Sequence, residues 1–130
     1  MQKAVVADVL EALAEAASRL WFPSESDAPL TPYLWPGARK PTPGALLRAE
    51  GHPPGTPVEI VKLEELFDAL TAPRPGATDT ARWRALVDLL ETHLEGLRVY
   101  RIGAVDVDAY VLGRHRSGAW LGLKTHLVET

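Results

Sequence analysis

The sequence predicts an α+β fold, in which helices pack on an antiparallel sheet, and three observations support this. Apolar residues in segments 3–20 and 79–95 recur at spacings of three and four, the period of a helix with one buried face. Residues 105–112 alternate between apolar and polar, as in a half-buried strand. A turn and a further apolar segment follow, as expected of a returning strand. The 130 residues are expected to form a single domain, 1–130.

The first third of the chain combines one long helix with a proline-rich segment. The helix is expected over residues 3–20, where five apolar side chains share one stripe. They are Val6, Leu10, Leu13, Ala17 and Leu20. Segment 22–43 is rich in proline and cannot form a long helix. Residues 33–35 are expected to form a short strand at a sheet edge, and residues 44–50 a short helix.

The middle of the chain predicts a strand and two further helices. Residues 58–63 alternate as a strand does, and the spacing then changes to that of a helix over 64–70. A loop over 71–80 follows. Thr78 or Asp79 is expected to cap the next helix through its side chain. That helix is expected to end near residue 95, with Gly96 as its stop.

The last third predicts a three-stranded meander. Strands are expected over 99–102, 105–112 and 119–128, with a hairpin turn at 115–118. Four side chains of the middle strand are expected to point to one face, which would ordinarily be the solvated one. They are Asp106, Asp108, Tyr110 and Leu112. Of the tryptophans, Trp83 is expected in the core, and Trp35 is a candidate for exposure.

Composition excludes several classes of function. A net charge of -3 argues against a general nucleic-acid binder, which normally carries a basic face. The absence of cysteine excludes thiol catalysis, disulfides and zinc–thiolate sites. No apolar run is long enough for a membrane span, and acidic residues interrupt the first apolar segment, so no signal peptide is expected. The expected location is therefore the cytoplasm.

Few residues suggest catalysis. The four histidines lack the spacing of a metal site and are expected at the surface or at helix ends. Asp106 and Asp108 point the same way and could bind a cation or divide acid and base roles, although such a pair more often lies on the solvated face of an antiparallel sheet. An enzyme using these two aspartates and a histidine is one open alternative. The basic triplet 114–116 is expected to be a solvated hairpin tip.

The most unusual feature is an acidic loop, Ser24-Glu25-Ser26-Asp27, which precedes several prolines. Three interpretations of it remain open. Ser24 and Asp27 match the spacing of a helix capping box. The loop could also be a plain solvated turn. The third interpretation is a small, concentrated negative site held on a stiffened loop.

The chain resembles the nuclease A inhibitor family. The resemblance rests on LWFPSESDAP at 20–29, on Leu34-Trp35, on VEIVKLEELF at 58–67, on VYRIGAVDVDAYVLG at 99–113, and on the final VET at 128–130. These segments occur in the family's order and spacing, and together they cover nearly the whole sequence. The Ser-Glu-Ser-acid core and the terminal VET are the more specific of these motifs.

The resemblance implies a three-layer α/β/α sandwich with a mostly antiparallel sheet between helices. It implies a non-enzymatic protein that inhibits a sugar-nonspecific, Mg²⁺-dependent ββα-metal nuclease. An inhibitor that inserts its own C-terminus works as a monomer, so a monomer is expected, although the sequence leaves the oligomeric state open. Glu25 would stand in for the scissile phosphate, with Ser24, Ser26 and Asp27 around it. Thr130 would reach the catalytic metal. That Mg²⁺ belongs to the nuclease, so no cofactor, nucleic acid or membrane is expected to bind the inhibitor itself.

One segment departs from the family pattern. The resemblance implies an acidic–aromatic pair, Asp-Trp, in the loop before the long helix, as a second contact with the nuclease. Here residues 72–76 read Ala-Pro-Arg-Pro-Gly, without acid or aromatic. The target could therefore differ, and a protein-binding module of the same fold with a partner other than a nuclease is the alternative.

Overall fold

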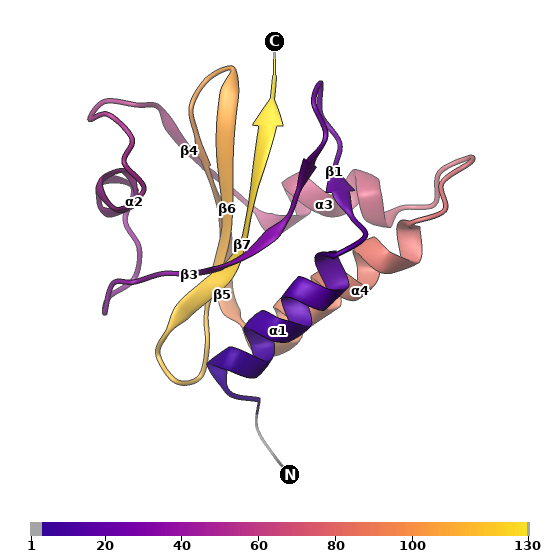
Figure 1. Ribbon diagram of the computed structural model, residues 1–130, viewed down its shortest axis with the longest axis horizontal. Coiled ribbons are helices and arrows are strands. Elements are labelled where there is room, and N and C mark those ends of the chain that lie inside the picture. Colours follow the sequence, from indigo (N-terminus) through magenta and orange to yellow (C-terminus); the bar gives the residue numbers. More distant parts are fainter. Residues whose placement is uncertain (1–3, 130) are drawn as a thin grey trace.

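The computed structural model describes residues 4–129 and confirms the α+β prediction. Within these residues there are four helices and seven strands, in an order that begins with a helix and ends with a hairpin (Figure 1). The helices are α1 (Val6–Ala17), α2 (Pro43–Ala49), α3 (Leu63–Thr71) and α4 (Thr80–His93). The strands are β1 (Trp21–Phe22), β2 (Ala28–Pro29), β3 (Thr31–Leu34), β4 (Val58–Val61), β5 (Glu95–Ile102), β6 (Asp106–Arg114) and β7 (Trp120–Val128).

Five strands form the main sheet, in the order β3-β7-β6-β5-β4, and every neighbouring pair is antiparallel. The meander predicted from the last third of the chain is β5-β6-β7. The proline-containing strand β3 lies at an edge, as expected, where it pairs with β7 in a register that sets Thr31 against Lys124. Strands β1 and β2 form a separate two-stranded hairpin.

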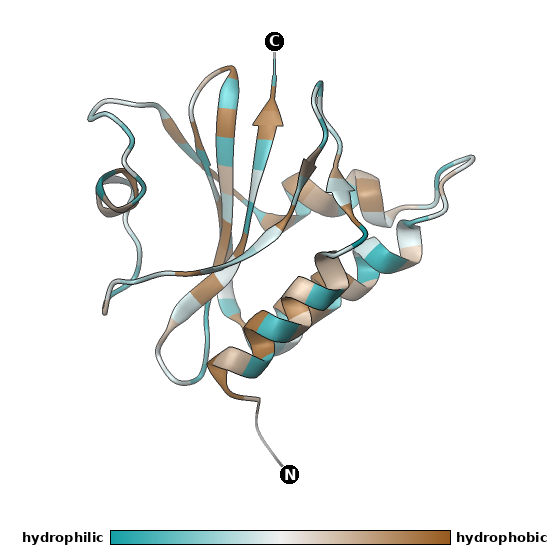
Figure 2. Ribbon diagram, in the orientation of Figure 1, coloured by the Kyte–Doolittle hydropathy of each residue, from teal (hydrophilic) through white to brown (hydrophobic). Residues whose placement is uncertain are grey.

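The sheet separates two layers of helix, as the resemblance implied. Helices α1, α3 and α4 lie on one face, and the short helix α2 lies on the other (Figure 1). The larger core is on the three-helix face, where the fully buried Trp83 of α4 contacts the rings of Phe22 and Phe67. Hydrophobic and hydrophilic residues alternate along β6 and β7 (Figure 2), so the inward residues of both strands join this core.

The α2 face is buried at Tyr110 and Leu112, although Asp106 is exposed and Asp108 is half-buried, which corrects in part the prediction of a solvated face. Tyr110 and Leu112 are fully buried in a smaller core together with Leu46 of α2. Trp35, a candidate for exposure, is buried in the same core and donates its indole N–H to the carbonyl of Arg39. The alternation of β6 gave the correct faces, but it could not reveal that a distant helix covers the second one.

Two expectations at the ends of α4 are wrong. Asp79 precedes the helix but makes no side-chain capping hydrogen bond. Its carboxylate instead accepts from Arg74 and from the indole N–H of Trp83. Gly96 does not stop the helix: it lies inside β5, with φ of 64°, where the register between β5 and β6 shifts. Gly96 therefore lies in a β-bulge.

None of the helices described within residues 4–129 is long and apolar enough to cross a membrane.

Candidate functional site

The acidic loop 23–27 is the tip of the β1–β2 hairpin, and the base of that hairpin is fixed in the main core. Phe22 is 7% exposed and meets both Phe67 and Trp83 edge to face, with ring centroids 6.1 and 5.9 Å apart. Its chain neighbour Trp21 points outward and is 57% exposed. The strand period of two thus places one aromatic ring in the core and the other at the surface.

Ser24 organises the loop through one hydroxyl group. Its Oγ donates to the carbonyl of Ser26 over 2.8 Å and accepts from the N–H of Ser26 over 3.3 Å and from the N–H of Val128 over 3.1 Å. One donor and two acceptors are all that a hydroxyl offers. No helix follows the loop, because β2 begins at Ala28. The capping-box interpretation is therefore wrong, and Ser24 instead forms a serine turn.

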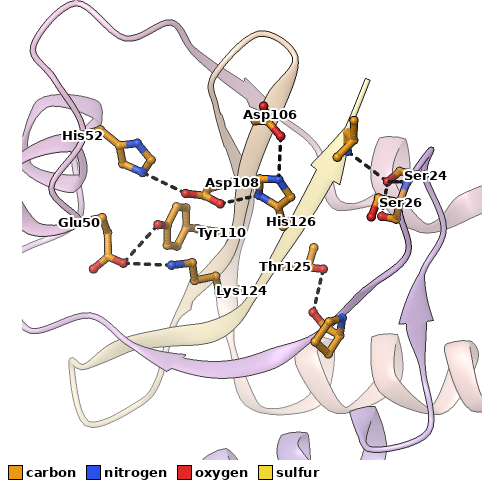
Figure 3. A network of polar contacts seen from close by, with 12 residues as sticks. Ser24, Ser26, Glu50, His52, Asp106, Asp108, Tyr110, Lys124, Thr125 and His126 are labelled. Carbon is orange, nitrogen blue, oxygen red and sulfur yellow. Dashed lines mark hydrogen bonds and ion pairs between the residues drawn. The ribbon is translucent and has the colours of Figure 1, made fainter. Parts of the chain in front are cut away.

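The same hydroxyl joins the loop to the end of β7. Besides the Val128 N–H bond to Ser24, the N–H of Glu25 donates to the carbonyl of Val128 over 3.3 Å. Further back, the buried Thr125 of β7 donates its hydroxyl to the carbonyl of Pro29 over 3.0 Å. Figure 3 shows Ser24 and Thr125 bridging the hairpin and β7. The Glu25 loop and the end of β7 are therefore held side by side.

The loop's acidic side chains are presented to solvent. Glu25, Ser26 and Asp27 are exposed, whereas Ser24 is half-buried beneath them. An open hollow of about 440 Å³ lies next to Glu25. Its polar lining includes Glu65 of α3, Arg101 of β5 and Glu129. Thr130, the other residue expected in the site, lies outside the described residues.

A second polar cluster lies on the α2 face and centres on Asp108 (Figure 3). His126 of β7 contacts Asp108 through Nδ1 at 2.8 Å and Asp106 through Nε2 at 3.3 Å, and His52 approaches the other oxygen of Asp108 at 3.3 Å. The hydrogen bond to Asp108 is the largest influence that raises the pKa of His126, and Asp106 adds to it. The two aspartates share a face, as predicted.

Glu50, just beyond α2, forms a neighbouring cluster on the same face. Its carboxylate accepts from the hydroxyls of Tyr33 at 2.8 Å and Tyr110 at 3.2 Å, and it forms an ion pair with Lys124 at 3.6 Å. Burial raises the pKa of both tyrosines, and Glu50 adds to the effect. Both hydroxyls therefore stay protonated and tie α2 to the sheet.

In both of these clusters the carboxylates are engaged by side chains of the same protein. Two of the hollows on the described surface lie between α3 and α4 and beside the end of β7. Within residues 4–129, no group of three or more His, Asp or Glu side chains has the geometry to hold a metal ion.

His115 corrects the prediction that the histidines lie at the surface or cap helices. It is 2% exposed. Its Nε2 lies 2.9 Å from the carbonyl of Ala4, before α1, and its Nδ1 lies 2.8 Å from the hydroxyl of Ser117 in the β6–β7 turn. The basic triplet is therefore a solvated tip only at Arg114 and Arg116. His93, by contrast, is the last residue of α4, as expected.

The charged residues of the loop before α4 bind each other and the first turn of the helix. Arg74 pairs with Asp79 at 2.9 Å, and Asp79 also accepts from the indole N–H of Trp83 at 3.0 Å. Because Trp83 is fully buried, neither this acid nor this aromatic ring is arranged as an exposed acidic–aromatic pair.

Two residues near the acidic loop escaped the sequence analysis. Arg101 forms ion pairs with Glu59 and Glu129, and the carbonyl of Val105 accepts from the N–H of Glu129 over 2.8 Å. Arg101 did carry a signal, because it is a charged residue two positions after the buried Val99, at an inward position of its strand. Val105 carried none, since a backbone carbonyl leaves no trace in a sequence.

A family model described as nuclease A inhibitor-like protein matches residues 7–130, which is nearly the whole chain. A search of curated proteins gives no match.

Proposed function

This chain belongs to the nuclease A inhibitor-like family, and we propose that it inhibits a sugar-nonspecific, Mg²⁺-dependent ββα-metal nuclease by occupying its active site. In this proposal Glu25 takes the place of the scissile phosphate, and Thr130 approaches the catalytic metal. The chain itself catalyses nothing, and the Mg²⁺ is the nuclease's own.

The chemistry of such a nuclease supports these roles. Its active site is a cationic pocket that binds a phosphodiester, so a carboxylate matches its charge without offering a bond to cleave. Mg²⁺ takes oxygen ligands and keeps exchangeable waters, which an incoming hydroxyl or carboxylate oxygen can replace. Ser24, Ser26 and Asp27 would then border the nuclease pocket and hold Glu25 in place.

One observation carries the proposal: the loop that bears Glu25 is hydrogen-bonded to the end of β7. The mechanism needs both groups to enter one pocket. The Glu25 N–H bonds to Val128, two residues before Thr130 in the sequence, and Glu25 itself is exposed. A loop already fixed in this way loses little conformational freedom on binding, which favours affinity. One copy of the chain supplies both groups, so a monomer is sufficient.

The test compares wild type with Glu25→Ala and with deletion of Thr130, both in capture of a nuclease from the source organism's extract and in inhibition of the captured enzyme. Each change is expected to weaken inhibition by at least roughly thirtyfold, which corresponds to the ~2 kcal/mol of a binding hot spot. Glu11→Ala removes the same charge from an exposed position on α1 and is expected to leave inhibition unchanged. If Glu25→Ala and the deletion of Thr130 both inhibit as strongly as wild type, the mechanism is wrong.

A second candidate is a binding module whose partner is not a nuclease. It is favoured by the loop before α4, where Arg74, Asp79 and Trp83 bind one another and supply no second acidic–aromatic contact. The test compares wild type with a variant that combines Glu25→Ala with deletion of Thr130. If both capture the same partner equally, and that partner is not a nuclease, this candidate is favoured.

A further inference from the structure

Arg101 occupies an unusual place for a cation. It lies on β5 opposite Glu59 of β4 and Ala109 of β6, on the sheet face that also carries the buried Val99. Its side chain is 23% exposed. A guanidinium with so little solvent needs compensating carboxylates, and it has two. Glu59 lies 3.7 Å from its Nε, and Glu129 binds its Nη2.

The turn between β5 and β6 also holds Glu129, through a hydrogen bond between the two backbones. The N–H of Glu129 donates to the carbonyl of Val105 over 2.8 Å. This turn has a fixed shape: Gly103 has φ of 116°, and a Cβ there would lie 2.1 Å from the carbonyl oxygen of Asp106. Its N–H is also bonded to the carbonyl of Pro57. Only glycine fits this turn.

The end of β7 is thus fixed from two sides. Ser24 and Glu25 hold Val128 on one side, and Arg101 and Val105 hold Glu129 on the other. In Figure 1 the hairpin tip, the β5–β6 turn and the end of β7 all lie at one end of the molecule. Four contacts at the last two described residues are more than the pairing of β7 with β6 requires, since that pairing ends at Val128.

We infer that Arg101 is a positioning residue for inhibition, and this inference rests on the proposed function. By binding Glu129, Arg101 holds the last described residue at the hollow that Glu25 also lines, and so fixes the point from which the chain continues. Without Arg101 the last residues must be ordered when the nuclease binds. Ordering about one residue's backbone at that moment corresponds to an affinity loss of about tenfold.

The first part of the test uses the free protein. Backbone ¹⁵N relaxation of Glu129 is measured in wild type, in Arg101→Leu and in a matched control, Arg98→Leu. Arg98 is an exposed arginine of the same strand that bonds only to the neighbouring Leu97 carbonyl among the interactions described. Arg101→Leu is expected to lower the order parameter of Glu129 below ~0.6, with the control near the ~0.85 of a rigid backbone. An unchanged order parameter in Arg101→Leu would overturn the inference.

The second part measures inhibition in two backgrounds, full-length and Thr130-deleted, with the nuclease captured by the wild type. Arg101→Leu is expected to weaken inhibition about tenfold in the full-length chain, with Arg101→Lys restoring part of it. In the deleted background Arg101→Leu is expected to change inhibition less than about twofold, because residue 130 is no longer there to be positioned.

The outcomes separate this inference from the proposed function. Equal losses from Arg101→Leu in both backgrounds would indicate general structural damage and overturn the positioning role. If Glu25→Ala and deletion of Thr130 both leave inhibition intact, the proposed function itself fails, and the role of Arg101 in inhibition falls with it.

Discussion

Replacing Ser24 by alanine removes the one hydroxyl that joins the acidic loop to β7. Three hydrogen bonds are lost, two within the turn and one from the Val128 N–H. A typical hydrogen bond contributes about 0.5–1.5 kcal/mol net. Ser24 is half-buried, so water satisfies part of what is left. The expected loss in the free energy of unfolding is therefore about 1–2 kcal/mol, at the lower end of the sum.

The assay is equilibrium denaturation, followed by nuclease inhibition with the same samples. For a chain of this size the predicted loss lowers the melting temperature by about 4–8 °C. Inhibition is expected to weaken about fivefold, because the loop must be reordered on binding. Ser26→Ala is the matched control for denaturation, since Ser26 enters the turn through its backbone N–H and carbonyl. If Ser24→Ala and Ser26→Ala lower the free energy of unfolding equally, the hydroxyl does not hold the loop and the reasoning fails.

Two further predictions concern the α2 face. Glu50→Ala is expected to lower the free energy of unfolding by about 2–3 kcal/mol, because Tyr33, Tyr110 and Lys124 lose a shared acceptor. Urea denaturation measures this loss, with Glu11→Ala as the control. A loss no larger than that of the control would contradict the prediction. His126 has a raised pKa in the folded protein because of Asp108, so its contribution is complete below the unfolded value of about 6.5 and is lost as the pH rises through the folded value. The difference in free energy of unfolding between wild type and His126→Gln is therefore expected to be larger at about pH 6 than at about pH 9. A difference that does not change with pH would show that the ion pairs of His126 with Asp106 and Asp108 do not persist in solution.

Periodicity predicted the elements of the fold well, because helices and strands follow local patterns. The alternation in β6 assigned Asp106 and Asp108 to one face, and the prolines placed β3 at an edge. The same patterns missed what distant segments cover. Trp35 and Tyr110 are buried because α2, formed by residues 43–49, lies over them, and no local spacing encodes that contact.

The candidate site was likewise predictable from local sequence only in part. The composition of loop 23–27 marked it as unusual, but its proximity to the end of β7 depends on a hydrogen bond between residues 104 positions apart. The role of Ser24 was open between a helix cap and a turn, since both use the same hydroxyl chemistry. It was decided by β2, which begins where a capped helix would continue. The salt bridges of Arg101 likewise join three segments that only the sheet order brings together.

The position of β7 also affects when the protein can complete its fold. It is an inner strand of the main sheet, although it is the last in sequence of the strands described within residues 4–129. Strand β3 and the hairpin that carries Glu25 have their partners on β7, so neither can dock during synthesis until β7 has been made. Contacts between segments so far apart in the chain form slowly. The nascent protein therefore completes the end of the molecule that carries Glu25 late, and a protease that removes β7 removes the partner of both β3 and the β1–β2 hairpin with one cut.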